Sequence, residues 1–190
     1  MKKVKTSKAA MLLAWAVTGL ISTSATSGAG EAAPAAFPHE QSATKTASSA
    51  SSVVGYIKNR HSGKCLTVHG ASKANNARVD QYTCVGAANQ RWTFEWTGGW
   101  SYALRNAHSG KCLTVHGASK AKGAAIDQYT CVGASNQSFY INIGTPSKTP
   151  LKAAHSKKCL DVRGGSTANN AAVIQWTCNG RTNQLWSIPD

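Results

Sequence analysis

The stretch HSGKCLTVHGASK, residues 61–73, decides the fold of this chain because it occurs three times. It returns unchanged from His108 to Lys120, and in altered form from His155 onward. Each copy begins 47 residues after the one before it. A fixed period of this length indicates copies of one supersecondary unit, each of which must pack against its neighbours to bury its apolar face.

The cysteines follow the same period. The first cysteine of each copy is followed 19 residues later by the second. The repeat therefore predicts one disulfide in each copy. The three expected bridges are Cys65–Cys84, Cys112–Cys131 and Cys159–Cys178. Paired cysteines favour an oxidising compartment.

Within the repeats, short β-rich runs alternate with Ser-Gly, Gly-Ala and Asn-Asn turn signals. These signals predict strands and hairpins, and no window shows a sustained helical period. We expect an all-β fold with about four short strands in each copy. Three sets of apolar residues should form its core around a pseudo-threefold axis: Ile57, Leu104 and Leu151; Leu66, Leu113 and Leu160; Trp92, Phe139 and Trp186.

The N-terminal region differs in composition from the repeats. Residues 1–36 have a lysine-rich start, an apolar run from Ala9 to Ile21 and then small residues, as a secretory signal peptide does. The apolar run is shorter than a membrane-spanning helix requires, so we expect no membrane span in the mature form. Residues 37–52 are rich in Ser, Ala and Thr and are interpreted as a linker. Residues 53–190 then form one domain, and the protein should be extracellular.

The domain is strongly basic. The chain has 21 Lys and Arg residues and 7 acidic ones, and five of the former and two of the latter precede residue 53, which leaves a net charge of +11. Such an excess attracts anionic partners, among them nucleic acid and anionic cell-wall polymer. The basic residues are spread over all three copies, so an ordinary soluble basic protein explains the same composition.

Three copies with a cysteine pair each also end in a Gln-x-aromatic motif, at Gln90-Arg91-Trp92, Gln137-Ser138-Phe139 and Gln184-Leu185-Trp186. In this combination the chain resembles the ricin B-type lectins, including bacterial carbohydrate-binding modules of secreted glycanases. The resemblance covers residues 53–189. It implies a β-trefoil of three 47-residue repeats, with one shallow sugar pocket in each repeat.

The third copy matches the pattern that this resemblance implies for a sugar site. Asp161 stands where a carboxylate accepts hydroxyl protons, and Trp176 stands where an aromatic ring stacks on the sugar. Asn183 is expected to bond a neighbouring hydroxyl. Gln184 is expected to orient Asp161 or to cap backbone groups.

The first two copies depart from this pattern, since Thr67 and Thr114 replace the carboxylate. Aspartates appear instead four residues before the second cysteine. We hypothesise that the carboxylate has moved to the facing strand, where it faces solvent and pairs with a nearby histidine; alternatively, these aspartates only balance the surrounding positive charge. The candidate residues are Asp80, Tyr82, Asn89, Gln90 and His69 in the first copy, and Asp127, Tyr129, Asn136, Gln137 and His116 in the second.

The sequence favours neither catalysis nor a cofactor. His61, His108 and His155 recur, but they lie on three separate hairpins and are interpreted as turn residues rather than metal ligands. The acidic residues form no recurrent close pair of the kind that hydrolyses glycosides, no serine stands in a nucleophile motif, and every cysteine is assigned to a bridge.

The leading hypothesis is a secreted, non-enzymatic and monomeric lectin that binds saccharides through up to three pockets acting together. Galactose, arabinose and xylose units all present suitable hydroxyl pairs. The alternative is a basic interaction protein that binds anionic cell-wall polymer or nucleic acid by charge, with vestigial sugar pockets. A third hypothesis is an inhibitor or toxin built on the same scaffold, for which the sequence offers no distinguishing loop.

Overall fold

A computed structural model describes residues 53–189, and its regular elements are strands and short 3-10 turns. The first repeat contains β1 Val53–Tyr56, β2 Lys58–Asn59, β3 Cys65–Val68, η1 His69–Ala71, β4 Ala77–Tyr82, η2 Ala88–Gln90 and β5 Arg91–Gly98. The second contains β6 Ser101–Asn106, β7 Cys112–Val115, η3 His116–Ala118, β8 Ile126–Tyr129, η4 Ser135–Gln137 and β9 Ser138–Tyr140. The third contains β10 Thr149–Pro150, β11 Lys152–Ala153, β12 Cys159–Val162, η5 Arg163–Gly165, β13 Ala171–Trp176, η6 Thr182–Gln184 and β14 Leu185–Ser187.

These elements confirm the all-β prediction. The proposed signal peptide, residues 1–36, and the proposed linker, residues 37–52, lie outside the described residues. Between residues 53 and 189 there is no helix long and apolar enough to cross a membrane.

The first and last strands of each repeat pair into a closed ring. β1 pairs with β5, β5 with β6, β6 with β9, and β9 with β11. β10, which leads into β11, pairs with β14, and β14 returns to β2. If β1 with β2 and β10 with β11 are each taken as one interrupted strand, the sheet closes on itself as a barrel does.

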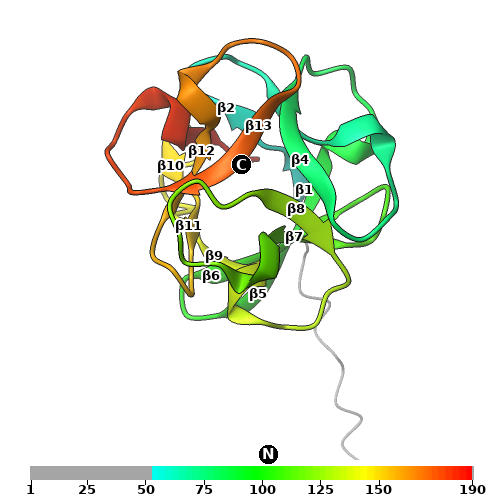
Figure 1. Ribbon diagram of the computed structural model, residues 1–190, viewed down its shortest axis with the longest axis vertical. Coiled ribbons are helices and arrows are strands. Elements are labelled where there is room, and N and C mark those ends of the chain that lie inside the picture. The colour runs from blue at the N-terminus through cyan, green and yellow to red at the C-terminus, as the bar shows by residue number, and fades with distance from the viewer. Residues whose placement is uncertain (1–52, 190) are drawn as a thin grey trace, which may run out of the picture. The chain divides into compact units, whose positions relative to one another are not determined.

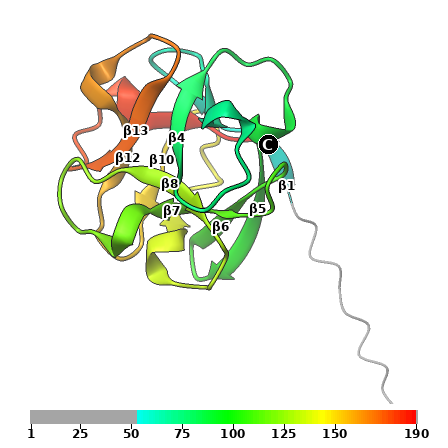
Figure 2. The same cartoon turned by 45° about the vertical axis from the view of Figure 1, so that its right-hand side comes forward.

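The middle strands of each repeat form a hairpin outside this ring. The hairpins are β3–β4, β7–β8 and β12–β13, and β4 pairs with both β8 and β13. Figure 1 shows β4, β8 and β13 arranged around a common centre, and Figure 2 shows the same three strands after a turn of 45°. A six-stranded barrel with three hairpins across one end is a β-trefoil, as the resemblance implied.

The core lies where the three repeats meet, and its members are the residues that the repeat predicts. Ile57, Leu66 and Trp92 are fully buried, as are their counterparts in the other repeats. The indole of Trp92 donates to the backbone oxygen of Leu66, and the indole of Trp186 to that of Leu160. Phe139 fills the same position without that hydrogen bond. Burying side chains of this size contributes roughly 1.5–3 kcal/mol each.

The three predicted disulfides are present. Cys65 is bonded to Cys84, Cys112 to Cys131, and Cys159 to Cys178. In each case one cysteine begins the first strand of a hairpin and the other follows its second strand. The bridges therefore hold the open ends of the three hairpins together.

A glycine allows the chain to turn after the first strand of each hairpin, which is β3, β7 or β12. Gly70 follows His69 with a φ of 58°, and Gly117 and Gly164 have φ values of 57° and 66°. Residues other than glycine rarely adopt these φ values. The turn holds the residue before each glycine beside the second strand of the hairpin. These residues are His69, His116 and Arg163.

Candidate functional site

The third repeat carries an open pocket of about 400 Å³ at its hairpin. Its polar centre is Asp161 on β12, which lies opposite Ile174 on β13. The residues around it come from β12, β13, η5 and the loop after the second cysteine. They are Asp161, Arg163, Gly164, Gly165, Ile174, Trp176, Asn179, Arg181 and Asn183.

Two amides hold the Asp161 carboxylate in place. Asn183 Nδ2 donates to its Oδ2 at 3.0 Å, and Gln184 Nε2 donates to the same oxygen at 2.8 Å. Both of these bonds go to Oδ2, so Oδ1 has no hydrogen-bond partner among the described residues; Asp161 is only 5% exposed but lines the pocket. The pocket thus presents a fixed, charged acceptor with one oxygen available. Burial raises the pKa of the Asp161 carboxyl, while the bonds from Gln184 and Asn183 oppose that shift.

Gln184 has both of the structural contacts proposed for it. Besides orienting Asp161, its Nε2 donates to the backbone oxygen of Thr177 at 2.9 Å, and its Oε1 accepts from the backbone of Asn179. Its side chain is buried, so it holds Asp161 in position without itself lining the pocket.

Trp176 supplies the aromatic wall. It is the last residue of β13, and 41% of its surface is exposed, which leaves the indole free to stack on a flat apolar ligand face. Gly123, from the second repeat, approaches it: a Cβ atom on that glycine would lie 3.7 Å from the indole. The neighbouring repeat therefore borders the third pocket.

In the first two repeats the carboxylate lies on the facing strand. Asp80 on β4 is directly opposite Thr67 on β3, and Asp127 on β8 is opposite Thr114 on β7. However, the expectation that these side chains face solvent is wrong. Asp80 is 1% exposed and Asp127 is 3% exposed.

Each of these aspartates is paired with the expected histidine. His69 Nδ1 lies 2.6 Å from Asp80 Oδ2, and His116 Nδ1 lies 2.6 Å from Asp127 Oδ2. Arg78 adds a second contact to Asp80 at 3.3 Å. Burial raises the pKa of both carboxyls, and the histidine partners lower it in part.

This pairing changes which group the first two pockets present. The Oδ1 atoms of Asp80 and Asp127 are buried and accept no hydrogen bond within residues 53–189. His69 and His116, by contrast, have about half of their side chains exposed (47% and 59%). The exposed polar group is therefore the imidazole, and the aspartate behind it fixes the orientation of the ring.

The remaining predicted residues of the first two repeats have the same arrangement in both. Tyr82 and Tyr129 are exposed. Asn89 donates to the backbone oxygen of Val68, and Gln90 to Thr67 Oγ1. Asn136 and Gln137 make the equivalent bonds to the backbone of Val115 and to Thr114. The threonine hydroxyl thus takes the place of the Asp161 oxygen as the acceptor for the buried glutamine.

Sequence reasoning missed a contribution from across the repeat boundary. The first pocket, of about 310 Å³, is lined by Asn170 of the third repeat as well as by its own residues. Backbone bonds explain this position, since Asn170 donates to Gln81 and lies beside β4. The order in which repeats meet around the barrel determines this contact, and no local pattern in the sequence carries it.

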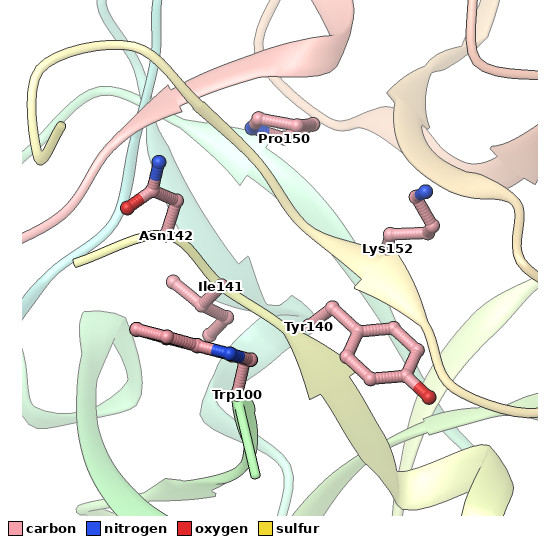
Figure 3. Close-up of a pocket in the computed structure, with 6 residues that line it drawn as sticks. All are labelled: Trp100, Tyr140, Ile141, Asn142, Pro150 and Lys152. Atoms are coloured by element: carbon pink, nitrogen blue, oxygen red, sulfur yellow. The ribbon is translucent and has the colours of Figure 1, made fainter. Parts of the chain in front are cut away.

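A second pocket of about 310 Å³ lies away from the predicted sites, beside the loop between β5 and β6 (Figure 3). Trp100, Tyr140 and Lys152 contribute to its walls, and Trp100 is 71% exposed. Figure 3 shows the Trp100 and Tyr140 rings below the segment of Ile141 and Asn142, with Pro150 and Lys152 on the facing strand. Trp100 has no tryptophan counterpart at the 47-residue period in the other repeats, and this difference is the sequence signal that could have indicated the pocket.

The recurrent histidines take turn positions on separate hairpins. His61 Nδ1 lies 3.3 Å from Thr182 Oγ1, and His155 Nε2 lies 3.0 Å from the backbone oxygen of Ser119. In the described part of the chain, no three His, Cys, Asp or Glu side chains gather in a way that could hold a metal ion.

Residues 53–186 match the model of the ricin-type β-trefoil lectin domain. The chain belongs to this family. A search among curated proteins finds no match for this lectin domain. Among solved structures it is similar to the designed threefold-symmetric protein ThreeFoil, with 40% identity and a TM-score of 0.70, over 72% of this chain and 98% of that one.

Two natural proteins are also similar to this lectin domain. An exo-β-1,3-galactanase from Clostridium thermocellum has 33% identity and a TM-score of 0.67, over 70% of this chain and 29% of the galactanase chain. A ricin B-like lectin from Macrolepiota procera, solved with lactose, has 24% identity and a TM-score of 0.58, over 71% of this chain and 93% of that one. The latter likeness concerns the fold alone.

Proposed function

We propose that this protein is a secreted, non-enzymatic lectin that binds saccharides reversibly at its hairpin pockets. The observation that carries the proposal is the third pocket, where a fixed carboxylate and an exposed indole line the same open hollow. A sugar ring has an apolar face that stacks on an indole and hydroxyl groups that donate to a carboxylate. The pocket offers both partners.

The first two pockets would contribute through a different polar group. There His69 and His116 meet the hydroxyl groups, Asp80 and Asp127 act as positioning residues, and Tyr82 and Tyr129 supply the stacking face. Single shallow pockets bind weakly, so useful affinity would come from several pockets that engage one polymer or surface. Family membership and the similarity to a galactanase segment support a carbohydrate ligand, and units of the galactose, arabinose or xylose type fit the hydroxyl pattern.

The test is a glycan array with the full exported chain, followed by titration calorimetry with the best saccharide. Binding that a free saccharide displaces at constant salt, and that Asp161→Asn weakens, is expected. Binding that no saccharide displaces would overturn the proposal.

A charge-driven partner is the second candidate, and the net charge of +11 favours it. Counterion release would then make binding to an anionic polymer fall steeply with salt, whatever neutral sugar is present. The same titrations, repeated at two salt concentrations, separate the two functions.

A further inference from the structure

The third pocket differs from the first in the charge of its wall. Arg163 and Arg181 line it. At the 47-residue period the equivalent residues of the first repeat are His69 and Ala87, and those of the second are His116 and Ala134. Asn179 likewise replaces Val85 of the first pocket. The third pocket has therefore acquired two cations at positions where the others carry an imidazole and a methyl group.

Neither guanidinium is engaged by an acidic side chain of the described residues. The ion pairs there join Asp80 to His69 and Arg78, Glu95 to Arg105, and Asp127 to His116. Asp161, the acid within the pocket itself, is bonded to amides instead. Two exposed guanidinium groups thus share a pocket with one carboxylate, and the pocket has an excess of positive charge.

The neighbouring repeat adds to this contrast. In the loop that borders the third pocket, Lys122-Gly123 stands where the other two copies have Asn-Asn, at Asn75-Asn76 and Asn169-Asn170. The backbone of Gly123 donates to Gln175 of β13, which places the loop beside that strand. Gly123 leaves the space next to Trp176 open, whereas Asn170 lines the first pocket with a side chain.

From these positions we propose that the third pocket selects an anionic saccharide, meaning a sugar ring that carries a carboxylate or a sulfate. The ring stacks on Trp176, and its hydroxyl groups donate to Asp161 and to Asn183 Oδ1, because both Asn183 N–H groups already donate to Asp161 and to the backbone oxygen of Val162. Its anionic group then meets Arg163 and Arg181, whose planar donors match the oxygens of carboxylate or sulfate. The first two pockets lack these arginines and take neutral sugar units. This inference rests on the proposed lectin function and names the ligand class of one of its sites.

The experiment follows the indole N–H signal of Trp176 by NMR while single sugars are added to the full chain at physiological ionic strength. The probes are galacturonate against galactose, glucuronate against glucose, and galactose 6-sulfate as the sulfate arm. Acetate serves as an anion without a sugar ring. We expect the uronates, the sulfated sugar or both to shift Trp176 with about tenfold higher affinity than the neutral sugars, the size expected for one hydrogen bond to a charged group.

Two variants replace the arginines of the third pocket with the residues that the other repeats have at the same positions. Arg181→Ala and Arg163→His should bring the affinity for the anionic sugar down toward that for the neutral one, with the neutral sugar little affected. Arg60→Ala is the matched control, since it removes one exposed positive charge that lines none of the described pockets. It should leave both affinities unchanged.

The outcomes separate this inference from the proposed function. Equal affinities for neutral and anionic sugars at Trp176 would overturn the inference and leave the lectin function standing. So would a loss in Arg60→Ala as large as that in Arg181→Ala, or displacement by acetate as effective as by galacturonate. If no sugar of either kind shifted Trp176, both proposals would fail for this pocket.

Discussion

The third hairpin and the first two share one scaffold but hold their carboxylates on opposite strands. Asp161 lies on β12, the first strand of its hairpin, where the amides of Asn183 and Gln184 fix one oxygen and the residue lines the pocket. Asp80 lies on β4, the second strand of its hairpin, and is buried behind His69. Moving the acid across the hairpin therefore changes it from a direct acceptor into a support for an imidazole. Equal scaffolds can thus carry unequal pockets.

The largest expected effect tests whether the scaffolds are equal. Replacing both cysteines of one repeat with serine, as in Cys159→Ser with Cys178→Ser, should lower the free energy of unfolding by about 3 kcal/mol, the value for a loop of this length. All three bridges close loops with the same separation of 19 residues. Urea unfolding of the three double variants should give similar losses. A lowered free energy of unfolding in only one of the three double variants would show that the repeats are not equally stabilised by their disulfides.

The next effect separates the pockets. Asp161→Asn keeps the shape of the side chain but removes its charge, and it should weaken saccharide binding at the third pocket by about 1.5–3 kcal/mol. Binding at the other two pockets should not change. Titration calorimetry measures this as a lost class of sites. An unchanged stoichiometry and affinity would mean that Asp161 contacts no ligand.

A smaller effect is expected from the histidines. His69→Ala should weaken binding at the first pocket by about 1 kcal/mol, the typical net contribution of one hydrogen bond. His116→Ala should do the same at the second pocket, because residues 61–73 and 108–120 are identical. Asp80→Asn should reproduce most of the loss at the first pocket if it acts by orienting the ring. Calorimetry in which Asp80→Asn weakens binding and His69→Ala does not would reverse these roles.

The parts of the molecule that the sequence predicts well are those that the repeat determines. Strands, disulfides and core residues recur at 47-residue intervals, so three copies support each assignment. The strand exchange of the carboxylate was also predictable, because Thr67 and Asp80 flank one hairpin. The burial of Asp80 was not, since it depends on how His69 and the strands pack over it. The contribution of Asn170 to the first pocket depends on contacts between distant repeats, which no local pattern encodes.

The smallest effect concerns the dependence of stability on pH, and it follows from the burial of Asp80. Burial raises the pKa of Asp80 in the folded protein above its ordinary value of 3.8, despite the contacts with His69 and Arg78. As pH rises past 3.8, the unfolded chain releases its proton first while the folded protein still holds it. The free energy of unfolding therefore falls between pH 3.8 and the raised pKa of the folded state, and it stays lower at neutral pH.

Asp80→Asn removes this titration, because an amide resembles the protonated acid at every pH. The variant should match the parent protein below pH 3.8 and exceed it in stability at neutral pH, while its first pocket binds saccharide less well. Thermal unfolding at both pH values measures the difference, and Asp127→Asn should behave in the same way because the pKa of Asp127 is raised by the same cause. A variant that is less stable than the parent only at neutral pH would show that the ion pair with His69 outweighs the cost of burial. A gain in stability together with a loss of binding would indicate that Asp80 serves the pocket at a cost to the fold.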